Sequence, residues 1–140
     1  MVPVKLTPED LEFLRRPLYG FFTVAAGADP PQPRPVWFEA TGDGTVELFT
    51  LADAAKVRRL RADPRASLVV AAPVGERERW VAVAGPTSLE DHGAQELAAR
   101  LAARYWDLDD GARTAELQEM LDADLLRVVI RPDKVARYTP

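Results

Sequence analysis

A cluster of cationic side chains lies near the middle of the chain, between two apolar runs. It follows a β-prone segment that ends at Thr50, and Asp63-Pro64 ends the cluster. A threonine hydroxyl at a strand end, free amides near the start of a helix and one lysine could together bind a phosphate. The solvated face of a short helix has the same pattern, so both interpretations stay open. The cationic residues are Lys56, Arg58, Arg59 and Arg61.

The charge of the whole chain restricts what such a cluster can bind. The 140 residues contain 18 Lys and Arg and 22 Asp and Glu, which gives a net charge of −4. An acidic protein is a poor match for nucleic acid or for an anionic membrane surface, so we expect neither as a partner. A local positive region on an acidic chain instead favours one small anionic ligand.

Residues that commonly perform catalysis or bind metals are scarce. The chain has no cysteine and a single histidine, His92, which we expect at the surface. Thiolate chemistry and cysteine-bound metals are therefore excluded, and we expect no metal site. No phosphate-binding glycine motif and no set of acid, base and nucleophile stands out, so the catalytic residues stay unknown. If the protein is an enzyme, a bound cofactor carries the reaction.

The sequence also bears on the compartment. The first residues, MVPVKLTP, contain no apolar targeting segment. No run approaches the roughly 18 apolar residues of a membrane-spanning helix. We therefore expect a cytoplasmic protein that has no membrane partner.

Large aromatic residues occur at positions that allow two functions. Trp37 and Trp80 lie in β-prone segments, where tryptophan most often packs in a core. Each could also contact a planar cofactor, and Trp80 could lie at an interface. Tyr105-Trp106 ends a helical pattern and favours a core or a dimer contact over a ligand site.

The pattern of apolar residues predicts a mainly β fold. A Thr7 cap followed by Pro8 predicts a first helix that ends before Pro17. Asp43-Gly44 between two β-prone runs predicts a hairpin. Further helices are expected over residues 51–62, with Asp53 as a possible cap, over 90–105 and over 113–121. Strands are expected over residues 18–26, 34–40, 45–50, 66–72, 79–88, 125–131 and 135–138.

Most of these strands are joined too closely for parallel crossovers, which favours antiparallel pairing. We therefore expect an antiparallel sheet of six or seven strands, curled into a barrel with helices outside. One domain, residues 1–140, would hold all of it. Its parts would be an N-terminal helical segment (1–16), a barrel core (17–90), a helical pair (91–122) and closing strands (123–140).

Residues 34–70, RPVWFEATGDGTVELFTLADAAKVRRLRADPRASLVV, resemble the core signature of a known family. The ordered features are Pro-Val-Trp-Phe on a strand, a glycine hairpin, Phe-Thr, a lysine, Leu-Arg and Asp-Pro-Arg. WVAVAGPTSLED and RVVIRPDKVARYTP continue the match in register. The set resembles the pyridoxamine 5'-phosphate oxidase-like split β-barrel proteins, and within them the flavin or deazaflavin oxidoreductases.

The resemblance implies a homodimer that holds FMN or the deazaflavin F420 in a groove between the subunits. It implies Thr50 and Lys56 at the cofactor phosphate, with Arg58 and Arg61 as helpers, and it leaves Arg59 as the solvated residue. Trp80 would reach the pocket of the neighbouring subunit. The strand Arg34 to Phe38 would pass beside the tricyclic ring. The further cofactor-binding residues expected are Arg34, Pro35, Val36, Trp37 and Phe49.

The expected function is hydride transfer between F420 or FMN and a small conjugated acceptor. The alternative is a protein that binds a flavin or deazaflavin for storage or sensing, without turnover. Oxidation of pyridoxamine phosphate ranks lower because it needs a second phosphate site. Three tryptophans on a small barrel also favour a dimer.

One segment departs from the family pattern. The family usually has a Gly-x-Pro turn between the first two strands, whereas this chain has the longer, proline-rich AGADPPQPRP. We expect this loop to reshape one wall of the cofactor groove.

Overall fold

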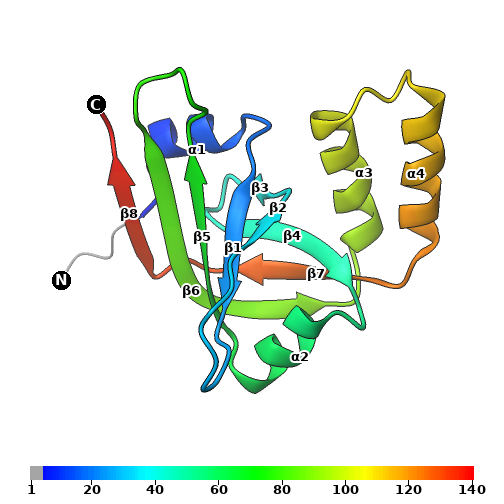
Figure 1. The fold of residues 1–140 in the computed structure, drawn as a ribbon, viewed down its shortest axis with the longest axis horizontal. Helices are drawn as coiled ribbons and strands as arrows, with labels where there is room; N and C mark the ends of the chain where they lie inside the picture. Colours follow the sequence, from blue (N-terminus) through cyan, green and yellow to red (C-terminus); the bar gives the residue numbers. More distant parts are fainter. Residues whose placement is uncertain (1–4) are drawn as a thin grey trace.

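The computed structural model describes residues 5–140, so the first four residues of the expected N-terminal segment lie outside it (Figure 1). Within this range there are four helices and eight strands. The helices are α1 (Pro8–Leu14), α2 (Ala55–Ala62), α3 (Ala94–Tyr105) and α4 (Gly111–Asp122). The strands are β1 (Gly20–Val24), β2 (Arg34–Val36), β3 (Glu39–Ala40), β4 (Val46–Leu51), β5 (Arg65–Ala71), β6 (Trp80–Glu90), β7 (Leu125–Ile130) and β8 (Lys134–Tyr138).

The strands form one curled, antiparallel sheet in the order β2-β1-β5-β6-β7-β4-β3, with β8 paired to β6. The long strand β6 joins the two halves of the sheet, because residues 80–86 pair with β5 and residues 87–90 pair with β7. Figure 1 shows β6 curving from one half to the other. The architecture confirms the prediction of a mainly antiparallel split barrel with flanking helices.

One position in β6, Gly85, has no room for a side chain. A Cβ atom on Gly85 would lie 2.2 Å from the carbonyl oxygen of Arg131. The neighbouring carbonyls of Pro86 and Ala84 accept hydrogen bonds at 2.9 Å from the backbone amides of Arg131 and Asp133. The chain that connects β7 to β8 therefore approaches β6 so closely that only glycine fits.

The predicted strand over residues 34–40 is wrong in one respect, because it is two strands. Val36 in β2 pairs with Gly20 in β1, whereas Ala40 in β3 pairs with Val46 in β4. Trp37 and Phe38 lie between them and carry the chain from one edge of the sheet to the other. This division raises the number of strands from the expected six or seven to eight.

The core fills the barrel and extends to both of its ends. Figure 1 shows α1 and α2 at opposite ends of the sheet, with α3 and α4 beside β4 and β7. Phe13 and Leu14 of α1 and Leu60 of α2 are almost fully buried in the core of the barrel. Large buried residues contributed by the strands and their connections include Phe22, Phe38, Leu48, Leu68 and Ile130.

Local signals at the helix ends are confirmed in part. Thr7 caps α1 in a reciprocal pair with Asp10, and Pro8 is the first helical residue, as predicted. The expected Asp53 cap of α2 is wrong, because β4 continues to Leu51 and the helix begins only at Ala55. Similarly, α3 begins at Ala94 rather than at residue 90, since β6 extends to Glu90.

Candidate functional site

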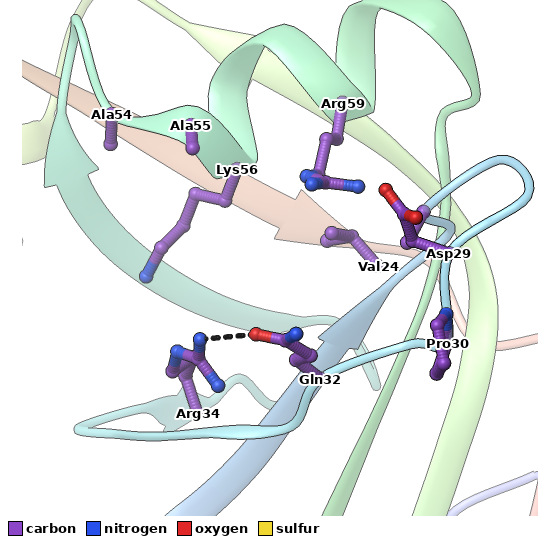
Figure 2. A pocket seen from close by; sticks show the side chains of 10 residues that line it. Val24, Asp29, Pro30, Gln32, Arg34, Ala54, Ala55, Lys56 and Arg59 are labelled. Atoms are coloured by element: carbon purple, nitrogen blue, oxygen red, sulfur yellow. Dashed lines mark hydrogen bonds between the residues drawn. The ribbon is translucent and has the colours of Figure 1, made fainter.

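A cavity of about 350 Å³, here called the basic cavity, lies between the end of β1, the proline-rich loop and the start of α2. Figure 2 shows the side chains of Lys56 and Arg59 entering it from the helix, while Arg34 lies on the opposite wall. Three cations thus line one small space. The full lining is Val24, Ala26, Asp29, Pro30, Gln32, Arg34, Ala54, Ala55, Lys56 and Arg59.

Lys56 is the most constrained of these cations. Its side chain is half-buried, and its ammonium nitrogen lies 5.8 Å from the centre of the Phe22 ring. Within residues 5–140 this nitrogen has no hydrogen bond and no carboxylate partner. Burial lowers the pKa of Lys56, and the charge of Arg34 lowers it further. An anion bound beside this ammonium would relieve both effects.

The proline-rich loop forms one wall of the basic cavity. Arg34 donates hydrogen bonds to Gln32 Oε1 at 2.6 Å and to the Pro33 carbonyl at 3.2 Å. These bonds hold the guanidinium in place. Arg59 extends toward the Asp29 carboxylate, which is the one acidic group in the lining (Figure 2).

The other predicted phosphate contacts lie elsewhere. Thr50 is 7% exposed, pairs with Leu126 in the sheet and does not line the cavity. Arg58 donates to the Asp53 carbonyl at 3.0 Å, and Arg61 faces solvent. Arg59, expected to be solvated, is exposed but lines the cavity. The basic cavity therefore brings together Lys56, Arg34 and Arg59 rather than the predicted set.

A second, larger space of about 640 Å³, here called the aromatic cavity, has no charged residue in its lining. Four of the expected cofactor contacts, Pro35, Val36, Trp37 and Phe49, line this cavity, whereas Arg34 lines the basic cavity. Sequence reasoning missed the remaining four, although Tyr19 and Phe21 are two residues apart, as side chains on one face of a strand are. The lining residues are Tyr19, Phe21, Pro35, Val36, Trp37, Phe49, Trp106 and Met120.

The indole of Trp37 is fixed by other aromatic rings. It stacks on Tyr105 with a centroid distance of 5.1 Å and an interplanar angle of 9°. Trp106 meets it edge-on at 4.8 Å and 88°, and Phe49 does so at 6.2 Å and 67°. These are favoured geometries for aromatic pairs. Trp37 is thus a rigid part of the wall, whereas Phe38 is fully buried in the core.

A single stretch of chain connects the two cavities. Arg34 lines the basic cavity, and the next three residues, Pro35, Val36 and Trp37, line the aromatic cavity. A ligand that lies along this stretch could place an anionic group on one side and an uncharged, flat group on the other. The arrangement fits a molecule with these two parts.

Trp80 lines neither cavity. It begins β6, is 37% exposed and lies opposite Tyr138 of β8. Its outward position therefore leaves it available to a partner.

Residues 5–140 contain no candidate metal site and no membrane-spanning helix. No group of three or more His, Cys, Asp or Glu side chains in this range could hold a metal ion. No helix in the same range has the length and apolar character to cross a bilayer. His92 precedes α3, and its ring lies 3.5 Å from Asp91 at the surface.

The family model for pyridoxamine 5'-phosphate oxidase matches residues 6–137. The chain belongs to the pyridoxamine 5'-phosphate oxidase family. Comparison with curated proteins finds no match. Family membership agrees with the split barrel and with the order of its elements.

Solved structures similar to this family member share its fold. An F420 reductase has a TM-score of 0.71 at 24% identity, covering 93% of this chain and 98% of its own. A conserved hypothetical protein from Mycobacterium tuberculosis also has a TM-score of 0.71, at 19% identity, covering 99% and 88%. A heme binding protein from Mycobacterium smegmatis has a TM-score of 0.60 at 26% identity; the match covers 94% of this chain and 55% of that protein.

Proposed function

We propose that the protein is an oxidoreductase that binds FMN or F420 and transfers a hydride to or from a small conjugated acceptor. The observation that carries this proposal is the half-buried Lys56 ammonium, which faces Arg34 beside an uncharged aromatic cavity. Similarity to an F420 reductase and membership of the family support it. We place the enzyme in the cytoplasm.

The residues present fit a cofactor with a phosphate and a flat ring. Lys56, Arg34 and Arg59 would hold the phosphate by charge-assisted hydrogen bonds. Pro35, Val36 and Trp37 would contact the ring. A bound flavin or deazaflavin supplies the hydride chemistry. No side-chain acid is needed where solvent supplies the proton.

Binding without turnover is the second candidate. The aromatic cavity contains no carboxylate and no imidazole in its lining, which suits a storage or sensing protein as well as an enzyme. Oxidation of the reduced cofactor by an added acceptor, followed by absorbance, separates the two. Pyridoxamine-phosphate oxidation is disfavoured because the aromatic cavity offers no cation for a second phosphate.

We also propose that two copies associate through the outer face of the sheet. Phe21, Val69, Trp80 and Tyr138 are all exposed on β1, β5, β6 and β8. A second copy on this face would bury them and would close the aromatic cavity, since Phe21 belongs to both surfaces. One apolar row crosses five strands in register, through Pro35, Phe21, Val69, Ala82 and Ala136.

Sedimentation velocity tests the dimer. We expect the wild-type protein to sediment as a dimer and Val69→Glu to sediment as a folded monomer, because a carboxylate would be buried without a partner. Val74→Glu is the matched control, since Val74 is fully exposed on the turn before β6. A wild-type monomer at all concentrations contradicts the proposal.

Titration of purified protein with FMN and with F420, followed by fluorescence, tests the cofactor site. We expect one of them to bind at micromolar concentrations. Lys56→Met should weaken its binding by about 1.5–3 kcal/mol, or roughly ten- to hundredfold, because a hydrogen bond to a charged group is lost. Arg61→Met, on the same helix but outside the cavity, is the control and should bind like wild type. Failure of the wild-type protein to bind either cofactor refutes the proposal.

A further inference from the structure

The barrel has a seam at Trp37 and Phe38. The order of the sheet ends with β2 on one side and β3 on the other, and within residues 5–140 these two strands form no ladder with each other. The chain alone joins the two edges. Trp37 nevertheless forms part of the aromatic cavity, so its position needs support from outside the sheet.

The C-terminal end of α3 supplies that support. Arg104 Nη1 donates a hydrogen bond of 3.0 Å to the carbonyl of Phe38. Arg100 donates two hydrogen bonds of 3.1 Å to the carboxylate of Glu39, the first residue of β3. The helix therefore holds the chain at the seam and just beyond it.

Tyr105 contacts the seam and the strand beside it. Its ring stacks on Trp37, and its hydroxyl donates a hydrogen bond of 2.6 Å to the carbonyl of Leu18, which precedes β1. Burial raises the pKa of Tyr105, while the Phe38 backbone and the charge of Arg104 oppose part of that rise. The hydroxyl is therefore protonated at neutral pH and remains a donor.

Neither Tyr105 nor Arg104 lines the basic or the aromatic cavity. We propose that both are positioning residues, which fix Trp37 across the seam and thereby set the wall that a flat ligand contacts. The part of this inference that concerns a ligand rests on the proposed function. The part that concerns Trp37 does not, since it is a property of the free protein.

The experiment measures binding of a flat ring and binding of an anionic group separately, with one probe for each. Lumiflavin, the tricyclic ring without a phosphate, reports on the aromatic cavity, and inorganic pyrophosphate reports on the basic cavity. The variants are Tyr105→Leu, which removes the stack, Tyr105→Phe, which retains it, and Arg104→Met. Arg100→Met is the matched control, because it releases Glu39 but leaves the contacts to Trp37 and Phe38.

We expect Tyr105→Leu and Arg104→Met to lower the affinity for lumiflavin about tenfold and to leave that for pyrophosphate unchanged. Tyr105→Phe should restore most of the lumiflavin affinity, and Arg100→Met should bind like wild type. Wild-type affinity for lumiflavin in both Tyr105→Leu and Arg104→Met overturns the proposal. Equal losses for the two probes also overturn it, since a general loss of structure acts on both cavities.

Near-ultraviolet circular dichroism gives a second measurement that needs no ligand. The band of Trp37 is assigned by its loss in Trp37→Phe. It should be lost in Tyr105→Leu, weakened in Arg104→Met and kept in Tyr105→Phe. If wild-type protein fails to bind lumiflavin, the ring-binding part of the proposed function fails, and this band decides the inference: an unchanged band in Tyr105→Leu and Arg104→Met refutes it.

Discussion

Two arginines beside α1, Arg16 and Arg137, have carboxylate partners, whereas the cations of the basic cavity lie without one. Arg137 Nη2 lies 2.7 Å from Asp10 Oδ2, and Asp10 is 1% exposed. Arg16 makes two hydrogen bonds, of 2.9 and 2.7 Å, to the carboxylate of Glu76. In the basic cavity, by contrast, no ion pair within residues 5–140 involves Lys56, Arg34 or Arg59, and one acidic residue faces three cations.

The contrast separates two uses of positive charge. A buried charge that has a partner and a full set of hydrogen bonds holds segments of the fold together, here α1 and β8. A desolvated ammonium beside a second cation lowers the stability of the free protein and strengthens the binding of an anion. Removing a charge should therefore lower the free energy of unfolding beside α1 and raise it in the basic cavity.

Asp10→Ala should give the largest effect on stability. It would leave Arg137 without its partner and would remove half of the reciprocal cap of α1. We expect the free energy of unfolding to fall by about 2–3 kcal/mol, measured by urea denaturation near neutral pH, because hydrogen bonds to a charged group and half of the cap are lost. Glu76→Gln breaks the exposed Arg16 pair near the same helix and should change the unfolding midpoint little, because water screens that pair.

The contribution of Asp10 to the stability of the fold depends on pH. Burial by itself raises the pKa of Asp10, but the hydrogen bonds from Arg137 and Thr7 and the charge of Arg137 outweigh it and hold the pKa below 3.8. The contribution of Asp10 to stability is therefore complete above pH 3.8 and is lost as the pH falls through the folded pKa. A difference between wild type and Asp10→Ala that stays constant down to acid pH contradicts this assignment.

Much of the fold was predictable because its signals are local. The cap at Thr7, the turn at Asp43-Gly44 and the antiparallel pairing of closely joined strands all depend on neighbouring residues. The division of residues 34–40 was not predictable, because it depends on pairing with β1 and with β4. The start of α2 was misplaced for the same reason: Leu51 stays in β4 because it pairs with Leu125.

The basic cavity was predictable in part. The sequence places Lys56 in a cationic cluster, and the structure places it in the cavity with Arg59 rather than with Arg58 or Arg61. Helical spacing explains this grouping, because Lys56 and Arg59 are three residues apart and share one face of the helix. The aromatic cavity could not be predicted without the fold, since Trp106, just after α3, and Met120 of α4 come to it with no local signal.

Lys56→Met should give the smaller effect on stability, with the opposite sign. Burial, and then the charge of Arg34, lower the pKa of Lys56 below 10.5. Between the folded pKa and 10.5 the unfolded chain binds more protons, so the stability of the free protein should rise with pH in this interval. Below the folded pKa the charge lowers stability, so we expect Lys56→Met to be more stable than wild type near neutral pH. Urea denaturation between pH 7 and pH 10 measures both effects, with Arg58→Met as the control because Arg58 is exposed and lies outside the cavity. A less stable Lys56→Met would show that this ammonium supports the fold as Arg137 does, and the distinction between the two regions would then fail.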